Sequence, residues 1–166
     1  MNATQTTVRP VAPADKAAIA QLWQALTDYH VALDPRLPAA TPGAAERYAD
    51  RLVERRDDPM TCVYVAEIDG QVIGYILGAI IDLYADLFEH SNVGFIADVF
   101  VEPAFRRQGI ARQLVDRVNA WLVEQGIRHT EWQVAAANTG GIRFWEAVGG
   151  LATMVRMQMP LAPSEE

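Results

Sequence analysis

The amino-acid sequence predicts a single α/β domain over residues 1–166, in which a mixed, mostly antiparallel sheet carries helices on both faces. Three observations predict this fold class. Strand-like and helix-like patterns follow one another in the order β-α-α-β-β-β-α-β-α-β. A two-residue hairpin signal, Asp69-Gly70, joins two adjacent antiparallel strands. A strand–helix–strand unit over residues 95–135 predicts one parallel pair with a right-handed crossover.

Composition limits the class of protein. With 166 residues, of which 51% are apolar and 21% charged, the chain is long enough to bury a sizeable core. A net charge of −7 argues against a nucleic-acid binder, which usually presents a basic face. The single cysteine, Cys62, excludes both a disulfide within the chain and a metal cluster built on thiolates. No metal site is expected, because the three histidines are widely spaced: His30, His90 and His129.

The N-terminus and the apolar runs bear on cellular location. No basic-then-apolar leader pattern opens the sequence. The longest apolar run, residues 72–81, is too short to span a bilayer. We therefore expect a cytoplasmic protein without a membrane partner, with loose ends at residues 1–5 and 160–166.

The first third of the chain is expected to form a strand and two helices. Residues 6–10 can form a short strand, and Pro13 suits a helix start. Apolar side chains then recur with helical spacing at Ile19, Leu22, Trp23 and Leu26. Prolines at positions 35 and 38 end that pattern, and Thr41 is expected to cap a helix running to about residue 56. The irregular connection, taken as residues 29–40, contains Tyr29 and His30, which are either solvated or at the border of a binding pocket.

Residues 61–68 and 71–81 predict a hairpin of buried strands. The first segment is rich in β-branched residues, and the second is apolar at nearly every position, which indicates a strand covered on both faces. A loop is expected over residues 82–91, with the acidic residues Asp82, Asp86 and Glu89. That loop is either a solvated acidic segment, or it attracts an ammonium group of the substrate to the edge of the sheet.

Residues 95–118 carry the clearest chemical signal. A buried strand over residues 95–101 leads through a loop with Pro103 into the turn of residues 106–111, and then into an amphipathic helix. Unpaired amides at the start of a helix, together with the positive end of its dipole, form a site for anions. A side chain at position 109 would hold a phosphate away from the backbone, and Gly109 has none. The turn therefore predicts a phosphate-binding site.

The remaining elements complete the sheet. The helix that begins at Ile110 is expected to end just before Gly126. A strand is then expected over residues 128–135 and a helix over residues 138–148. Two glycines stop that helix, and a final strand is expected over residues 151–159.

Two segments resemble a known family. They are Asp98-Val99-Phe100-Val101 followed by Arg106-x-x-Gly109-x-Ala111, and the later Asn138…Phe144-Trp145-Glu146…Gly149. Both are similar to motifs of the GCN5-related N-acetyltransferases, which use acetyl-CoA, and the resemblance covers residues 8–157. It implies the same fold and transfer of an acetyl group from acetyl-CoA to an amine. The acceptor is either a small molecule (a polyamine, an amino acid or an aminated drug) or a peptide.

The resemblance also implies which residues touch each substrate. The backbone of residues 99–101 is expected to pair with the amides of the pantetheine arm, as in strand addition. Asn138 is expected either to bond to that arm or to act as a simple helix cap. The expected contacts of acetyl-CoA are Val99, Phe100, Val101, Arg106, Arg107, Gln108, Gly109, Ile110, Ala111, Arg112, Asn138 and Trp145. The expected contacts of the acceptor are Tyr29, His30 and Asp98.

Asp98 is the predicted catalytic residue. It is a charged residue within an apolar strand, where charges seldom lie without a partner, and it would bind the amine and help deprotonate it directly or through water. The alternative is a structural role, either a salt bridge or a bond to a neighbouring loop. Strict alternation places Asp98 opposite its neighbours, so a β-bulge would decide which way it points. Several relatives carry a second acidic residue at the position that matches Ala97.

Trp145 marks the main departure from the resembled family. The matching residue is commonly a tyrosine that protonates the coenzyme thiolate, whereas an indole N–H is not a usable acid. The thiolate then leaves unaided or with help from water, or a tyrosine donates (Tyr29, Tyr75 or Tyr84), or catalysis is poor. The alternative function is therefore a non-catalytic acyl-CoA-binding sensor. A nucleotide-binding domain is disfavoured because neither G-x-G-x-x-G nor G-K-[ST] occurs. Many relatives dimerise, so a homodimer is an open expectation.

Overall fold

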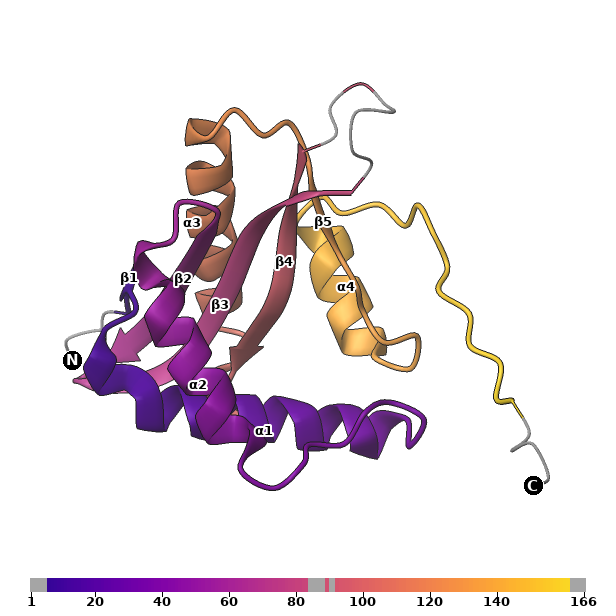
Figure 1. The fold of residues 1–166 in the computed structure, drawn as a ribbon, viewed down its shortest axis with the longest axis horizontal. Coiled ribbons are helices and arrows are strands. Elements are labelled where there is room, and N and C mark those ends of the chain that lie inside the picture. The colour runs from indigo at the N-terminus through magenta and orange to yellow at the C-terminus, as the bar shows by residue number, and fades with distance from the viewer. Residues whose placement is uncertain (1–5, 84–88, 90–91, 162–166) are drawn as a thin grey trace.

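The computed structural model describes residues 6–83, 89 and 92–161, and these form one five-stranded sheet with helices on both faces (Figure 1). The strands are β1 Thr7–Pro10, β2 Thr61–Ile68, β3 Gln71–Asp82, β4 Asn92–Val101 and β5 Thr130–Trp132. The helices are α1 Lys16–Leu33, α2 Ala44–Glu54, α3 Ile110–Glu124 and α4 Thr139–Ala147. Short 3-10 turns lie at Pro13–Asp15, Arg55–Asp57 and Pro103–Phe105.

The sheet has the predicted mixed topology. Its order is β1-β2-β3-β4-β5, with antiparallel neighbours from β1 to β4 and a parallel β4–β5 pair. Asp69 and Gly70 form the tight turn between β2 and β3, with φ of 49° and 81°. Positive φ at both residues is typical of the two-residue hairpin that the dipeptide predicted. The α/β fold class is therefore confirmed.

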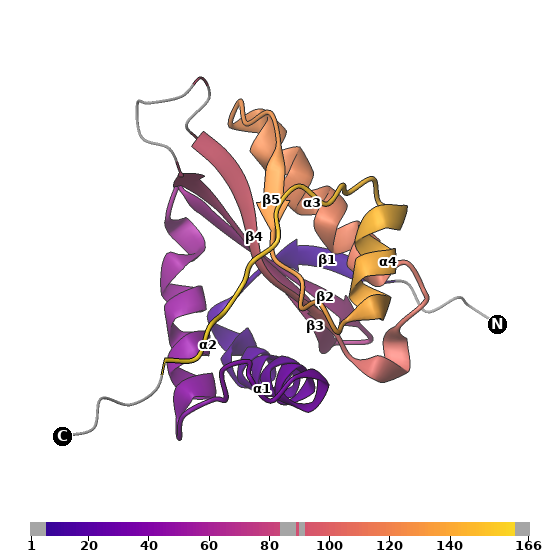
Figure 2. The ribbon, with the colours of Figure 1, turned by 90° about the vertical axis from the view of Figure 1, so that its right-hand side faces the viewer.

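Each face of the sheet has its own apolar core. Helices α1 and α2 cover one face, and α3 and α4 lie on the other (Figure 2). The apolar residues predicted at helical spacing in α1, Ile19, Leu22 and Leu26, lie in the core on the α1 and α2 face. Leu114 and Val118 of α3 lie in the core on the opposite face. Strand β3 is buried at most positions, as its continuous apolar run predicted.

A β-bulge in β4 creates the feature on which the site depends. Gly78 of β3 pairs with Ile96 and Leu77 pairs with Asp98, so Ala97 is an extra residue without a partner. The parallel pairing of β4 with β5 ends at the same place, with Ile96 opposite Trp132. Bulges interrupt pairing and increase local twist. Residues 99–101 of β4 consequently have a partner strand on the β3 side, and the chain after β5 runs away from them (Figure 1).

Three predicted boundaries were wrong. Helix α1 continues to Leu33, so Tyr29 and His30 lie on a helix and not in an irregular connection. Helix α2 begins later than predicted, at Ala44 after Gly43 in the left-handed region with φ of 69°. Strand β5 has three residues in place of the predicted eight, because its pairing with β4 ends at the bulge. Most of the predicted acidic loop lies outside the described residues.

The predicted final strand over residues 151–159 is not formed. Residues 151–161 are irregular, and their large apolar side chains are 80–89% exposed: Leu151, Met154, Val155, Met157, Met159 and Leu161. The prediction was wrong, because a strand needs a neighbouring strand to satisfy its backbone groups. In a single chain this segment, called here the C-terminal segment, has no adjacent strand in the sheet.

Candidate functional site

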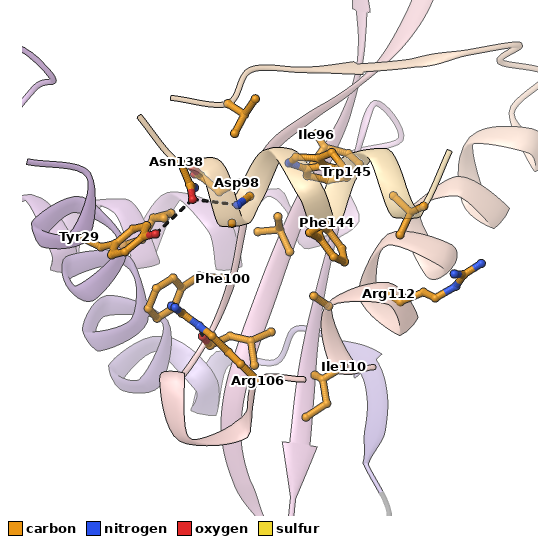
Figure 3. Close-up of a pocket in the computed structure, with 18 of the residues that line it drawn as sticks. Tyr29, Ile96, Asp98, Phe100, Arg106, Ile110, Arg112, Asn138, Phe144 and Trp145 are labelled. Atoms are coloured by element: carbon orange, nitrogen blue, oxygen red, sulfur yellow. Dashed lines mark hydrogen bonds between the residues drawn. The ribbon is translucent and has the colours of Figure 1, made fainter. Parts of the chain in front are cut away.

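A cavity lies where β4 separates from β5. It has a volume of about 640 Å³ and is bordered by α1, the second half of β4, the start of α3, and α4 (Figure 3). Of the predicted site residues, all but Gln108 line this cavity: Tyr29, His30, Asp98, Val99, Phe100, Val101, Arg106, Arg107, Gly109, Ile110, Ala111, Arg112, Asn138 and Trp145. Segments more than a hundred residues apart in the sequence thus meet at one place.

The turn before α3 has the geometry of an anion site. Gly109 has φ of 77°, and a Cβ atom placed on it would meet no atom within 4 Å. The first intrahelical bond is donated by the Gln113 amide to the Gly109 carbonyl, 3.1 Å away, so the amides of residues 110–112 have no partner within the helix. Gln108 is exposed and does not line the cavity. Unpaired amides therefore border open space at the positive end of the helix dipole.

Arg106 ties the turn to β4 and α1. Its Nε donates to the Val101 carbonyl oxygen at 2.9 Å, and its guanidinium lies over the rings of Phe100 and Tyr29, at 5.3 and 5.6 Å from their centroids. The side chain therefore has a structural task that sequence reasoning did not foresee. It fixes the turn while keeping a positive charge at the cavity wall.

The free edge of β4 supplies backbone groups to the cavity. In an antiparallel pair, alternate residues direct their N–H and C=O groups toward the partner strand, and the others direct them away. Residues 99–101 pair with β3 on one side only, so the outward-directed groups of this stretch face the side that β5 has left. This arrangement suits an extended ligand that carries amides.

The bulge at Ala97 decides where Asp98 points. Ile96, Val99 and Val101 belong to the core beneath α3, and Phe100 belongs to the core beneath α1 and α2. The extra residue breaks the strict alternation after Ile96, so Asp98 lies on the same face as Phe100, toward α2. There its Oδ2 accepts a hydrogen bond of 2.5 Å from the Tyr48 hydroxyl.

The electrostatics of Asp98 favour a carboxyl group that holds its proton more tightly than usual. Burial raises the pKa of Asp98, whereas the hydrogen bond from Tyr48 and the electrostatic effect of His30 act to lower it. Tyr48 itself was missed by sequence reasoning. The only available signal was a tyrosine on the apolar side of α2, next to the buried Ala45 and Ala49, because its partner is fifty residues away in the chain.

Asn138 links α4 to α1 at the mouth of the cavity. Its Oδ1 accepts from the Gly141 amide at 2.9 Å, which makes it the N-cap of α4, and it also accepts from the Tyr29 hydroxyl at 3.1 Å (Figure 3). The cap is therefore present, and binding of the pantetheine arm by Asn138 stays a prediction.

Trp145 lines the inner wall of the cavity. It is 8% exposed and stacks on Trp132 with ring centroids 4.3 Å apart, with Phe144 in edge contact at 5.0 Å. Of the tyrosines considered as substitutes for a general acid, Tyr75 is fully buried and does not line the cavity, and Tyr84 lies outside the described residues. The Tyr29 hydroxyl is engaged with Asn138.

Comparison with known families decides the identity of the fold. The model of the Acetyltransferase (GNAT) family matches residues 19–150. The chain belongs to this family. The match includes β4, the turn of residues 106–111, α3 and α4, all of which border the cavity of this GNAT domain.

Individual relatives agree with the family. An aminoglycoside N(6′)-acetyltransferase type 1 of Salmonella typhimurium is 31% identical over 86 residues, which cover 52% of this chain and 59% of that protein. The protein of the same name from Stenotrophomonas maltophilia is 29% identical over 99% of both chains. Among solved structures, the aminoglycoside N-acetyltransferase AAC(6′)-Iy in complex with CoA has a TM-score of 0.74 at 21% identity, covering 96% of this chain and 97% of that one. The structural likeness shows the GNAT fold.

No group of three or more histidine, cysteine or acidic side chains is placed to hold a metal ion in the described part of this GNAT chain. Within the same ranges, none of the helices combines the length and apolar character that crossing a bilayer requires.

Replacing Asn138 by alanine is expected to lower the free energy of unfolding by about 1 kcal/mol, because the Gly141 amide loses its cap. Aspartate at this position keeps an acceptor oxygen and is expected to retain most of the stability. Urea denaturation followed by circular dichroism measures both variants. An alanine variant as stable as the unmodified protein would show that the cap contributes nothing.

Proposed function

We propose that this GNAT protein transfers the acetyl group of acetyl-CoA to a primary amine by direct attack. One observation carries the proposal: the phosphate turn, the free edge of β4 and Asp98 border a single cavity. The turn offers unpaired amides for a diphosphate, and the strand edge offers amide partners for the pantetheine arm. Asp98 borders the same cavity, on the face of β4 that is directed toward α2.

The protein's own groups account for each requirement of the reaction. An alkyl ammonium titrates near pH ~10, so it must lose a proton before it can attack, and Asp98 is the carboxylate that takes this proton directly or through water. The amine nitrogen then bonds to the thioester carbon, the carbon–sulfur bond breaks as the thiolate leaves, and the nitrogen gives its second proton to water to form the neutral amide. A backbone N–H from residues 99–101 is the donor to the developing oxyanion.

The leaving thiolate has no tyrosine to protonate it at position 145. Trp145 stacks on Trp132 and presents no acidic hydrogen. We propose that the thiolate leaves unaided or receives a proton from water, since a thiolate is a tolerable leaving group.

The acceptor is proposed to be a primary amine of a small molecule, with a peptide amine as the remaining option. Two relatives are named aminoglycoside N(6′)-acetyltransferases: one aligns with about half of this chain, and the other aligns with nearly all of it. An aminoglycoside is therefore the first amine to test, followed by polyamines and amino acids. The cytoplasmic location stays a prediction, which the search for spanning helices does not address.

A thiol-release assay with acetyl-CoA and a panel of these amines, at neutral to mildly alkaline pH, tests the proposal. We expect coenzyme A release that depends on one class of amine and on acetyl-CoA together. Release at the rate of spontaneous hydrolysis with every amine, from protein that binds acetyl-CoA, would instead support the acyl-CoA-binding sensor that Trp145 suggests.

We further propose that two copies of the chain exchange their C-terminal segments as added strands. In the segment of residues 151–161 the one charged residue is Arg156, and six large apolar side chains lie exposed. Strand β5 is an edge strand with a single neighbour, so its other side is open to a strand from a second copy. A mutual exchange of this kind forms a closed two-fold dimer.

Deleting residues 151–166 is expected to convert a dimer into a monomer without unfolding it, because residues 151–161, the described part of this segment, contribute no side chain to either buried core. Light scattering after size-exclusion chromatography measures the change. Met157→Glu serves as a point variant that places a charge in the added strand, and it is expected to weaken the dimer. A monomeric full-length chain would refute the exchange.

A further inference from the structure

Tyr48 is in direct contact with the proposed catalytic carboxylate, although it does not line the cavity. It belongs to α2, and its hydroxyl donates to Asp98 Oδ2 at 2.5 Å. No other hydrogen bond to the Asp98 carboxylate is recorded among the described residues. Since Asp98 lines the cavity, its remaining oxygen, Oδ1, is available to a ligand there.

The Tyr48 ring is held in place from two sides. It stacks on Trp23 of α1, with centroids 4.9 Å apart and planes inclined by 19°, and it makes an edge contact with Tyr75 of β3 at 6.3 Å. Trp23 and Tyr48 both pack against the core between these helices and the sheet. Packing from α1 and β3 therefore restricts the phenol to the rotamer that reaches Asp98.

Toward Asp98 the phenol of Tyr48 acts as the donor. Burial raises the pKa of Tyr48 far above that of a free tyrosine, and the Asp98 charge adds to this shift. Among the described residues, the titratable groups that act on Asp98 are Tyr48 on α2, Tyr75 on β3 and His30 on α1, and burial raises the pKa of Tyr75 as well. Both phenols thus stay neutral over the working range of pH, and the proton of the hydrogen bond belongs to Tyr48.

We propose that Tyr48 is a positioning residue for amine acetylation: by holding Asp98 Oδ2, it turns Oδ1 of the same carboxylate toward the acceptor amine. This inference rests on the proposed function. Helix α2 does not border the cavity. Through Tyr48 it nevertheless controls the geometry and the ionisation of the carboxylate that receives the proton.

The Tyr48→Phe variant removes the hydroxyl and keeps the stacked ring. We expect kcat/KM for the amine to fall about tenfold or more, since a hydrogen bond to a charged group is lost. The acid limb of the pH profile should move to higher pH, because the bond lowers the pKa of Asp98. The KM for acetyl-CoA should stay unchanged, because Tyr48 lies outside the cavity that the coenzyme would occupy.

The matched control is Tyr64→Phe, which makes the same chemical change at a tyrosine that is 7% exposed, on β2, and packed in the core beneath α3. It should leave the pH profile and the kinetic constants unchanged. A double-mutant cycle with Asp98→Asn gives a second criterion: Tyr48→Phe should have no further effect in the asparagine background if it acts through Asp98.

A measurement on the free protein separates this inference from the proposed function. The titration of the Asp98 side-chain carbon, followed by NMR, should show a higher pKa in Tyr48→Phe than in the unmodified protein or in Tyr64→Phe. An unchanged Asp98 titration, or equal kinetic losses from Tyr48→Phe with and without Asp98, would overturn the positioning role. Lack of turnover with every amine would instead overturn the proposed function, while the titration would still decide the role of Tyr48.

Discussion

The Gly109→Glu variant is expected to lose acetyl-CoA binding, with a dissociation constant raised at least about 100-fold. A Cβ at this position points into open space bordered by the first amides of α3, where the proposal places the diphosphate. The glutamate would occupy that space and bring a negative charge against the phosphates. Isothermal titration calorimetry with CoA measures the loss directly.

Backbone strain needs a separate control, because Gly109 has φ of 77° and any other residue is strained there. Gly126→Glu provides it. Gly126 follows the other end of α3 with φ of 76°, also has open space around its Cβ, and does not line the cavity. We expect this variant to share the loss of stability and to retain CoA affinity. Equal affinities of the two variants would argue against a diphosphate at Gly109.

The Asp98→Asn variant is expected to lose about 10²–10⁴-fold in kcat/KM for the amine while binding acetyl-CoA normally. Asparagine has nearly the same shape but cannot take a proton from the ammonium. The unmodified protein should show an acid limb above the usual aspartate range, since burial raises the pKa of Asp98, and the variant should lack this limb. Activity is lost as pH falls through that pKa, because the carboxylate is the active form.

The same substitution is expected to leave the protein as stable or more stable at pH 8. The folded-state pKa of Asp98 is raised above its unfolded value, so the folded protein binds this proton more tightly than the unfolded chain does. The resulting cost to stability is absent below the unfolded pKa of about 4 and is complete once pH exceeds the folded pKa. Asparagine avoids this cost and can still accept from Tyr48. Thermal unfolding at pH 4 and pH 8 measures the difference.

Asp50→Asn is the control for both measurements. Asp50 is an exposed carboxylate, also on the α2 helix, with its side chain 2.7 Å from the Lys16 ammonium. It should change neither the pH profile nor catalysis. Full activity in Asp98→Asn would remove Asp98 from the proposed mechanism, and a large loss of stability at pH 8 would show that the carboxylate stabilises the fold.

Local patterns predicted the parts of the site that depend on neighbouring residues. The turn at Gly109 follows from a strand, a short loop and a helix start within one stretch, so its position and its open amides could be foreseen. The cap of α4 at Asn138 is similarly local. The possibility of a bulge beside Asp98 was foreseen, and Ala97 supplies it.

Features that depend on distant segments could not be predicted from sequence. The partner of Asp98 is Tyr48, on a helix whose apolar face gives no hint of a hydrogen bond to β4. Arg106 was expected beside a diphosphate, yet its Nε bonds the Val101 carbonyl. The C-terminal segment was predicted as a strand and is irregular, because a strand needs a partner and a local pattern does not say which segment provides one.

The most direct test of the central claim is an NMR titration of the unmodified protein with CoA, followed through its backbone amides. We predict saturable binding at one site, with the largest shifts at the amides of Gly109, Ile110 and Ala111 and along residues 99–101. Absence of binding, or shifts confined to other parts of the chain, would contradict a coenzyme held between the phosphate turn and the free edge of β4.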